Sequence, residues 1–440
     1  MVENIIPFFN QVMKHKIGLY IQTKGYKNLD LSNPEFGNPG IGGTQFCFLE
    51  LGFYLLKYYG HDYDISVFSE EPLNLPNGFN NILVCGMHQL INEVYNAHID
   101  ILILKTPMEL SDYEVISKSN DTKVIVWSHN YFNSNIAKAI TRCDKIALNV
   151  FVSKQMYDFY IDNDIINKST YIYNIVPDVI GNCMRTVKPY TLTYMGCLDP
   201  VKGIVELLKI WLIVEKKCPS AQLYIIGGDL YDRKGEESGR HNIVDTRIGK
   251  IISKYILDKN GKPKPNIHFL GILGKEKYDV FLSSSVGIVN PSARTETFGL
   301  GIIEMASAKL PVVTKKWNGH PDTAIDGETA LLGFSIKQMA YNIIKLFEDN
   351  VLNEKLGENA KVEVKRFASQ VIISRWHKYL QSIINGSLVI EHYNISHPFW
   401  NNYKIIRYIN SLLRLKLHLP FWPSVVACET QINNIIKKLR

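Results

Sequence analysis

Two glutamates eight residues apart, with two glycines between them, have the types and spacing that could do chemistry. The segment RTETFGLGIIEMASAKLP (294–311) contains Glu296, Gly299, Gly301 and Glu304. Such a pair could be the acid and base of a hydrolase, part of a nucleotide site, or two unrelated surface charges. Because glycine costs about 1 kcal/mol inside a helix, the two glycines fit better where a loop turns into a helix. We therefore expect Glu296 in a loop and Glu304 near the start of the helix that follows.

A helix that begins within Phe298-Gly299-Leu300 would offer unpaired backbone N–H groups and the positive end of its dipole to a ligand. Phosphate groups bind well at such helix ends. A carboxylate one turn into the helix, at Glu304, could accept both hydroxyls of a ribose. The segment thus indicates a nucleoside diphosphate held between the helix end and the acid. In the simpler interpretation Glu304 only complements the helix dipole and Glu296 is a solvated loop charge.

A second junction of the same kind lies at TLTYMGCLDPVKGIVELLKIW (191–211). A short apolar strand ends at Gly196, a loop follows, and Lys202-Gly203 opens a long helical segment. A lysine at this place could neutralise the diphosphate of a leaving group. An exposed lysine beside a helix start is the simpler alternative.

The elements that must position these residues alternate along the chain. Runs such as IGLYIQT (17–23) and KVIVWSH (123–129) contain four to six apolar residues without strict alternation. Such runs are typical of strands covered on both faces, as in a parallel, doubly wound sheet. The pattern stops over residues 172–190, which hold two prolines and a glycine, and restarts at residue 191. The sequence therefore predicts an α/β protein with two such domains.

The length of 440 residues also favours two domains, because a single hydrophobic core stops growing before this size. We expect an N-terminal Rossmann-like domain over residues 1–180 and a second α/β domain over 190–370. A basic, helical extension should follow over 371–440. Ligands of open sheets bind at the carboxyl ends of the strands, so the chemistry should lie there.

Composition argues against several classes of protein. The seven cysteines are scattered and odd in number, which speaks against a disulfide scaffold or a zinc site. The N-terminus does not have the pattern of a signal peptide, and no apolar run approaches the roughly 18 residues that span a bilayer. We therefore expect a cytoplasmic protein. Most of the net charge of +7 lies in residues 386–440, so nucleic acid is not expected as a partner.

Taken in order, these segments resemble the retaining glycosyltransferases of the GT-B fold, which include glycogen synthase relatives and sugar transferases of lipopolysaccharide and O-antigen. The donor half has the strand–glycine–loop–Lys-Gly–helix junction, then IIGGD, FLG and NPSARTETFGLGIIE, in which Glu296 and Glu304 match the family's E-x7-E motif. In the other half GIGGTQ (40–45) and WSHN (127–130) are similar to its glycine-rich loop and its histidine-bearing strand end. The resemblance covers most of residues 15–370.

The resemblance implies two doubly wound Rossmann-like domains that face a central cleft. The domain over residues 1–180 would lie on the acceptor side, and the domain over 190–370 would bind the nucleotide-sugar donor. It implies transfer of a sugar from a nucleotide-sugar co-substrate to a glycan or lipid-linked acceptor, with retention and without a metal or other cofactor. A role in cell-surface polysaccharide synthesis, such as that of lipopolysaccharide or O-antigen, is associated with the family. Glu304 would bind the ribose of the donor, Glu296 would lie beside the hydroxyls of its sugar, and Lys202 would hold its diphosphate.

Further residues are implied on both sides of the cleft. Phe298, Gly299 and Leu300 would line the donor site with their backbone amides, and Gly42 and Gly43 would let the N-terminal loop approach the diphosphate. His129 would face the donor sugar, which makes Glu296, His129 and Lys202 the candidate catalytic residues. The family's arginine after the first donor-domain strand is replaced by Cys197. Lys202 must then act alone or with another cation, for which Arg294 is the candidate.

Other functions stay open from the sequence. The strongest alternative is a catalytically weak or inactive sugar-nucleotide-binding subunit of a glycan-assembly complex, which Cys197 makes conceivable. A glycoside hydrolase also uses paired carboxylates, and a nucleotide-sugar epimerase would share the overall fold. The two Asp-x-Asp motifs, at residues 62–64 and 162–164, open a strand and occupy a polar turn. We do not expect either to bind a metal.

The segment NYKIIRYINSLLRLKLHLPFWP (402–423) has two chemically different sides when drawn as a helix. Apolar residues occupy one side and cations the other: Ile405, Tyr408, Ile409, Leu412 and Leu413 against Lys404, Arg407 and Arg414. A basic amphipathic helix suits an anionic membrane surface, here the inner face of the plasma membrane, and would fit a lipid-linked acceptor. Alternatively, its apolar side packs back onto the N-terminal domain.

Overall fold

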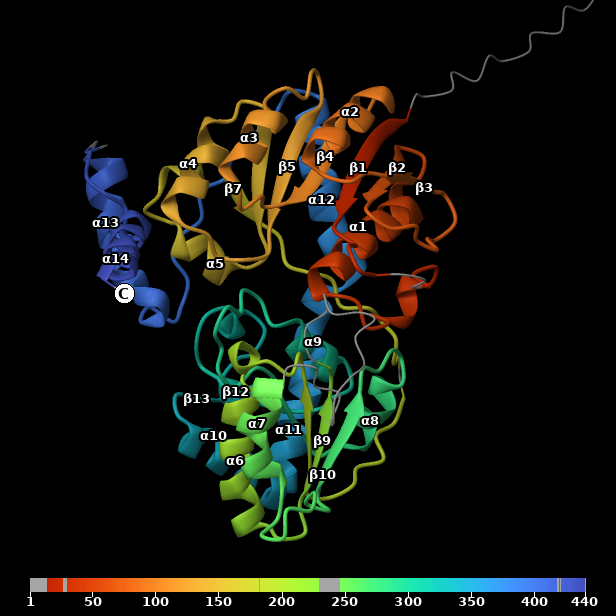
Figure 1. The fold of residues 1–440 in the computed structure, drawn as a ribbon, viewed down its shortest axis with the longest axis vertical. Helices are drawn as coiled ribbons and strands as arrows, with labels where there is room; N and C mark the ends of the chain where they lie inside the picture. The colour runs from red at the N-terminus through yellow and green to blue at the C-terminus, as the bar shows by residue number, and fades with distance from the viewer. Residues whose placement is uncertain are drawn as a thin grey trace, which may run out of the picture.

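The computed structural model describes residues 14–26, 30–181, 183–228, 246–417, 419 and 421–439. Two parallel α/β units face each other in it, and the chain ends in a separate pair of helices beside the first unit (Figure 1). The expectation of an α/β protein with two doubly wound sheets is confirmed. Most of the candidate residues lie in loops or in the first turns of helices that face the space between the units.

The first sheet has seven described strands in the order β3-β2-β1-β4-β5-β6-β7, all of them parallel. Its strands are β1 (His15–Ile21), β2 (Tyr63–Ser69), β3 (Phe79–Leu83), β4 (Ile101–Lys105), β5 (Lys123–Ser128), β6 (Ile146–Phe151) and β7 (Ser169–Tyr171). The helices of this unit are α1 (Gly43–Tyr59), α2 (Met87–Asn96), α3 (Leu110–Ile116), α4 (Ser134–Arg142) and α5 (Lys154–Phe159). The central strands β4 and β5 are buried along nearly their whole length because helices cover both faces.

The second sheet has six described strands in the order β10-β9-β8-β11-β12-β13, again parallel. Its strands are β8 (Thr191–Met195), β9 (Gln222–Ile226), β10 (Ile267–Gly271), β11 (Val286–Ile288), β12 (Val312–Lys315) and β13 (Ala330–Gly333). The helices are α6 (Ile204–Lys217), α7 (Thr246–Ile256), α8 (Lys277–Ser283), α9 (Leu300–Ser307), α10 (Ile336–Glu348) and α11 (Asn350–Glu363). In this order the loops after β8 and β11 lie side by side at the carboxyl edge.

Helix α12 (Ser369–Ile384) follows the second unit in sequence but packs on the first. The indole of Trp376 is fully buried and meets that of Trp127 edge to face, with 4.9 Å between ring centroids. The imidazole of His377 stacks on Tyr59 of α1 at 3.8 Å. The chain therefore crosses between the two units a second time, beside the first crossing: the backbone nitrogen of Val176 donates to the backbone oxygen of Phe367 at 3.0 Å.

The C-terminal segment docks on the first unit through its cations, so the expectation that its apolar side packs back onto that unit is wrong. In α13 (Lys404–Ser411) the side chains of Lys404 and Arg407 are fully buried, whereas Ile405 and Ile409 are 52% and 54% exposed. A helix projection shows that two sides differ, but it does not show which side has partners. Here the partners are acids: Asp158 for Lys404, Glu429 for Arg407 and Asp164 for Arg414.

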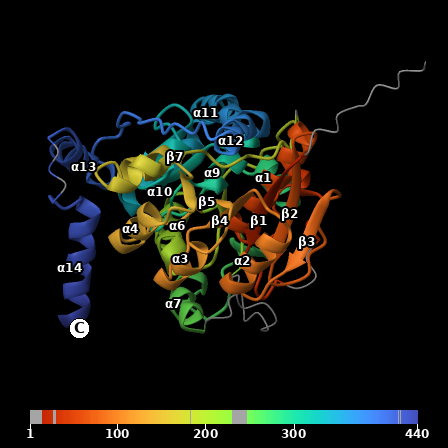
Figure 2. The same cartoon turned by 90° about the horizontal axis from the view of Figure 1, so that it is seen from above.

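The last helix, α14 (Val425–Leu439), contacts α4 and α13 near its start. Its residues 431–438 are exposed, and Figure 2 shows the helix extending away from the body of the protein. None of the helices in the described part of the chain combines the length and the apolar character that crossing a membrane requires.

Candidate active site

A cavity of about 460 Å³ lies between the two units, in the range typical of small-ligand sites. The first unit contributes the loop before α1 and the end of β5. The second contributes the loops after β8, β9 and β11 and the start of α9. Nine of the ten residues singled out from the sequence line this cavity: Gly42, Gly43, His129, Lys202, Glu296, Phe298, Gly299, Leu300 and Glu304.

The glycine loop of the first unit ends at Gly42, which is the N-cap residue of the 17-residue helix α1. A Cβ atom on Gly43 would lie 3.1 Å from Cδ1 of Leu300, which belongs to the opposite unit. A side chain at this place would therefore press directly against the second unit. Its absence lets the backbone of the loop and the N-terminus of α1 come close to the start of α9. Two helix N-termini thus contribute to the same cavity, and both favour negative charge.

Helix α9 begins as the glycine pattern predicted. Gly299 is its N-cap, with a φ of +100° that other residues rarely adopt. A Cβ on Gly301 would lie 3.0 Å from Cε of Met195 and 3.1 Å from Cγ1 of Val289, so the helix lies close to the sheet. Phe298 is buried and packs on Tyr173 and Phe367, which fixes the loop before the helix.

The carboxylate of Glu304 is held by a buried lysine. Nζ of Lys277, at the first position of α8, lies 2.9 Å from Oε1 of Glu304, and both side chains are nearly buried. This pairing leaves Oε2 of Glu304 for a ligand, since no hydrogen bond to that atom is found within the described residues. Glu304 lines the cavity one turn inside α9, as a diol-binding acid would.

Glu296 lies in the loop before α9 and is paired with Lys202. Nζ of Lys202 is 3.3 Å from Oε2 of Glu296, and Nδ2 of Asn290 donates to the same oxygen at 3.0 Å. Burial raises the pKa of Glu296, but the charges of Lys202 and His320 and these hydrogen bonds outweigh it and lower the pKa to about 2. Glu296 is therefore an anion at any physiological pH and is unsuited to act as an acid.

Lys202 ends a 3₁₀ turn (Pro200–Lys202) that leads into α6. Gly203 follows with a φ of +85°, and a Cβ there would lie 2.7 Å from the backbone nitrogen of Ser292. This close approach of the two loops brings Lys202 from one junction and Glu296 from the other into contact. The side chain of Lys202 is 35% exposed, so its ammonium group remains accessible to a ligand.

His129 follows the end of β5 and lines the cavity from the first unit. Its ring packs against Trp127 at 4.6 Å and Phe48 at 5.9 Å between centroids. Burial, with a smaller contribution from the charge of Lys105, lowers its pKa to about 3. The imidazole is therefore neutral at neutral pH. Its backbone oxygen accepts a hydrogen bond from Oγ1 of Thr297, which joins the two units beside the cavity.

The buried imidazole has a consequence for stability that can be measured. In the unfolded chain His129 takes up a proton near pH 6.5, whereas in the folded protein it stays neutral, so its contribution to stability falls as the pH drops below 6.5. Between pH 7.5 and 5.5 the wild type should lose about 1.4 kcal/mol more unfolding free energy than His129→Gln. Urea titrations at the two pH values measure this. Equal losses would mean that His129 is protonated in the folded state.

The structure does not bring Arg294 to the cavity. Its side chain is 63% exposed and points to Glu206, at 3.6 Å. Cys197, which stands at the family's arginine position, is buried and lines the cavity. Of the two cations proposed for the diphosphate, only Lys202 therefore faces the space where a ligand would lie.

Comparisons with known proteins relate the second unit to a described family. The family model "Glycosyl transferases group 1" matches residues 185–363, which contain Lys202, Glu296 and Glu304. The capsular polysaccharide biosynthesis glycosyltransferase CapM of Staphylococcus aureus is 26% identical over 266 residues. Residues 185–363 thus form a group 1 glycosyltransferase domain. A trehalose synthase of Pyrococcus horikoshii is also 26% identical, over 195 residues.

The sequence matches to these two relatives cover only part of each protein. The CapM match spans 59% of this chain and 59% of CapM, and the trehalose synthase match spans 44% of this chain and 43% of that enzyme. The structure of Anabaena HepE with UDP and glucose is 15% identical, with a TM-score of 0.62 over 84% of this chain and all of HepE. At this identity the likeness shows the fold. The two facing Rossmann-like units form the GT-B fold.

Two functional candidates were missed from the sequence. Lys277 is one, because nothing local connects it to Glu304, 27 residues away. Glu50 is the other: it lines the cavity from α1, is 1% exposed, and neither carboxyl oxygen has a hydrogen-bond partner among the described residues. Burial and the nearby Glu304 raise its pKa well above the usual range. A single acid inside the apolar run FCFLELGFYLL was the signal that could have found it.

Within the described residues no group of acids, histidines and cysteines is arranged to hold a metal ion. Of the two Asp-x-Asp motifs, the one at residues 162–164 binds the C-terminal segment instead. Oδ2 of Asp162 accepts from Nδ2 of Asn410 at 2.7 Å, and Asp164 pairs with Arg414. The two acids of this motif therefore hold the C-terminal segment on the first unit.

Proposed function

We propose that this protein transfers a sugar from a nucleotide-sugar donor to a glycan or lipid-linked acceptor, with retention of configuration and without a metal ion. One observation carries the proposal. The cavity between the units combines a diol-binding acid, Glu304, with two helix N-termini and an accessible cation, Lys202. Ribose, diphosphate and sugar require these groups side by side.

The chemistry follows from the charges in the cavity. As the bond between the anomeric carbon and the phosphate oxygen breaks, negative charge grows on the departing diphosphate. The N-terminus of α9 and the ammonium group of Lys202 stabilise that charge without having to reorganise. The oxygen of the acceptor attacks from the same side, and its proton passes to the departing phosphate. The anionic Glu296 takes no part as an acid and instead accepts hydrogen bonds from the hydroxyls of the donor sugar.

The names of related proteins support the finer parts of this proposal. CapM is a capsular polysaccharide biosynthesis glycosyltransferase, and HepE was solved with UDP and glucose. We therefore place this protein in cell-surface polysaccharide synthesis, with lipopolysaccharide or O-antigen among the products considered, and put uridine diphosphate sugars first among the donors. Such an enzyme would act on the cytoplasmic side of the membrane.

The test is a donor panel of UDP-, GDP- and ADP-sugars, with release of the nucleoside diphosphate measured with and without a glycan acceptor fraction. We expect release from one class of donor, and we expect the acceptor to accelerate it, because closure of two domains excludes water. A chain that neither binds nor cleaves any donor would contradict the proposal.

One observation favours a second function, a sugar-nucleotide-binding subunit with weak or no catalysis. Cys197 lines the cavity where the family resemblance places an arginine, so the diphosphate meets one cation fewer. The same donor panel separates the two functions. A binding subunit would gain thermal stability from a donor yet release no nucleotide when the acceptor is added.

We further propose that the protein attaches to an anionic membrane surface through the C-terminal segment, by its apolar side. Ile405, Ile406 and Ile409 are each more than half exposed on α13. Phe421 is fully exposed and Trp422 is 54% exposed. Among the described residues of the last two helices, the exposed cations are Lys437 and Lys438, in the last turn of α14. Insertion of apolar and aromatic side chains at the lipid boundary would supply most of the binding free energy.

Replacement of Ile405 and Ile409 by serine should lower co-sedimentation with vesicles of phosphatidylethanolamine and phosphatidylglycerol about tenfold, because two buried apolar side chains are lost from the lipid boundary. The matched control replaces two valines of α11 that are even more exposed, Val351→Ser and Val362→Ser, and should sediment like the wild type. If the tail variant and this control sediment equally, the apolar side of α13 does not bind lipid.

A further inference from the structure

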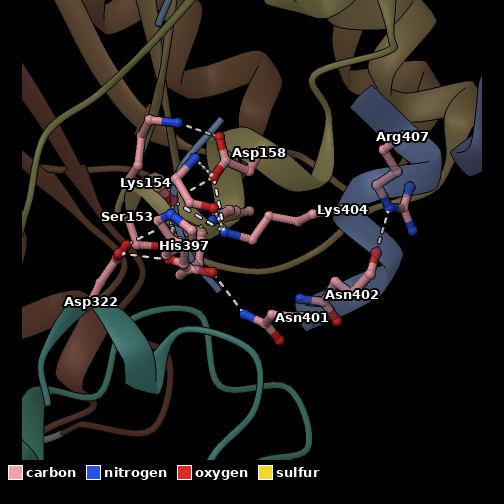
Figure 3. Close-up of polar contacts among 12 residues, drawn as sticks. Ser153, Lys154, Asp158, Asp322, His397, Asn401, Asn402, Lys404 and Arg407 are labelled. Atoms are coloured by element: carbon pink, nitrogen blue, oxygen red, sulfur yellow. Dashed lines mark hydrogen bonds and ion pairs between the residues drawn. The ribbon is translucent and has the colours of Figure 1, made fainter. Parts of the chain in front are cut away.

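A buried polar junction joins the C-terminal segment to both units (Figure 3). Its centre is Asn401, which is fully buried. Nδ2 of Asn401 donates to Oε1 of Gln155 in the first unit at 2.7 Å and to the backbone oxygen of Asn318 in the second at 2.7 Å. Its Oδ1 accepts from the backbone nitrogen of Asn318 at 2.9 Å. One side chain of the C-terminal segment, called the tail below, therefore bridges the first and the second unit.

The two units also meet directly at this junction. The backbone nitrogen of Gln155 donates to Oδ2 of Asp322 at 2.8 Å, and its Nε2 donates to Oδ1 of Asp322 at 3.2 Å. The same Nε2 lies 3.1 Å from the backbone oxygen of His397 in the tail. All the polar atoms of the Gln155 side chain are thus used by groups from the tail and the second unit.

The tail is fixed in place by buried charge. Nζ of Lys404, three residues after Asn401, lies 3.1 Å from Oδ2 of Asp158 and donates to the backbone oxygen of Ser396 at 2.8 Å. Lys404 and Asp158 are both fully buried, and Lys154 pairs with the other oxygen of Asp158 (Figure 3). A charge in such a place is stable only while its partner stays, so the tail has one well-defined docked position.

The turn that Asn401 holds, Asn318–His320, lies directly against the loop before α9 that contains Glu296. The backbone nitrogen of Gly319 donates to the backbone oxygen of Glu296 at 3.0 Å, and Nδ2 of Asn318 donates to the oxygen of Ala293 at 2.7 Å. A Cβ on Gly319 would lie 2.2 Å from the carbonyl carbon of Thr297, so the two backbones are in contact. His320, the next residue, is fully buried near Glu296 and favours its anionic form.

We infer that Asn401 is a positioning residue for the candidate site: it fixes the turn Asn318–His320 against Glu296 and ties that turn to α5 of the first unit. The donor site is then complete only when the C-terminal segment is docked. This inference rests on the proposed function, since it gives the segment a role in the reaction of the same cavity. It gives a part in sugar transfer to Asn401, which lies outside the matched residues 185–363.

The inference can be tested without any assay of activity. Asn401→Ala leaves the N–H and C=O of Asn318 without partners, so the turn opens more often. The amides of Asn318 and Gly319 should then exchange their hydrogens about tenfold faster. Hydrogen exchange of the full-length protein, read out by mass spectrometry over residues 316–323, measures this. The matched control is Asn410→Ala, which removes another buried asparagine whose side chain bonds to Asp162 of the first unit and to Pro423 of the C-terminal segment but not to the second unit.

Kinetics then distinguish positioning from general destabilisation. With the donor identified by the panel above, Asn401→Ala should lower kcat/KM about tenfold, whereas Asn410→Ala should stay within about twofold of the wild type. Gln155→Met removes the side-chain hydrogen bonds of Gln155 to Asn401 and Asp322, so it weakens the junction from the side of the first unit and should reproduce the loss. This second variant also covers the case in which Asn401→Ala folds poorly.

Wild-type exchange over 316–323 in Asn401→Ala, or the same increase in Asn410→Ala, would overturn the inference. So would a kcat/KM that these two variants lower equally. If the wild type turns over no donor at all, the proposed function fails, and the exchange comparison still decides whether Asn401 holds the turn.

Discussion

Glu304→Ala should abolish the thermal stabilisation that the cognate nucleoside diphosphate gives to the wild-type protein. The carboxylate is nearly buried, is oriented by Lys277, and lines the cavity within reach of a ribose placed at the start of α9. Each hydrogen bond from a hydroxyl to a charged acceptor contributes about 1.5–3 kcal/mol, so losing two reduces affinity at least a hundredfold. At ligand concentrations that saturate the wild type, the shift in Tm should fall below about 1 °C.

The measurement is the difference in Tm with and without UDP, GDP or ADP, because the substitution also leaves Lys277 unpaired and lowers Tm by itself. The control is Glu358→Ala, which removes an exposed carboxylate of the same domain that pairs with Lys309. It should keep the full ligand-dependent shift. A full shift in Glu304→Ala would show that the ribose binds elsewhere.

Lys202→Ala should lower kcat by a factor of about 10² to 10³. A single preorganised group that stabilises charge developing in the transition state is typically worth this factor. The ammonium group is partly exposed, so its loss leaves no buried cavity. Lys202→Arg keeps the charge and should restore part of the rate. Lys209→Ala, on the exposed side of α6, serves as the control and should leave kcat unchanged.

The wild type and Lys202→Ala should also differ in how their activity depends on pH. In the wild type burial raises the pKa of Glu296, but other effects, of which the charge of Lys202 is the largest, outweigh it and lower the pKa to about 2. Activity should therefore not fall on the acid side through Glu296. Without Lys202 the largest effect that lowers this pKa is lost, so the pKa of Glu296 rises. The variant should therefore lose activity as the pH falls over a range in which the wild type does not. Parallel acid limbs in the two proteins would mean that Lys202 and Glu296 are not coupled.

The two junctions of the donor half could be predicted because their signals are local. Gly299 must adopt a positive φ, and Gly203 must allow two loops to touch, so both restrict what the neighbouring residues can do. Glu296 in a loop and Glu304 inside the next helix followed from these restrictions. The alternation of apolar runs with helical segments likewise predicted the parallel sheets that the structure contains.

What could not be predicted depends on partners far away in the sequence. Lys277 and Glu304 are 27 residues apart, and Asn401 and Gln155 are 246 apart. The C-terminal helix shows the difficulty most clearly. Its projection separates cations from apolar residues correctly, but only the fold reveals that Asp158 lies where Lys404 docks, so that the cations point inward.

The central claim is that the cavity between the two units holds the phosphorylated carrier of a sugar. A crystal structure with the nucleoside diphosphate that stabilises the protein tests it most directly. We expect the ribose hydroxyls against the carboxylate of Glu304 and the diphosphate between the N-terminus of α9 and Lys202. A nucleotide bound away from these residues, with the cavity empty, would contradict the claim.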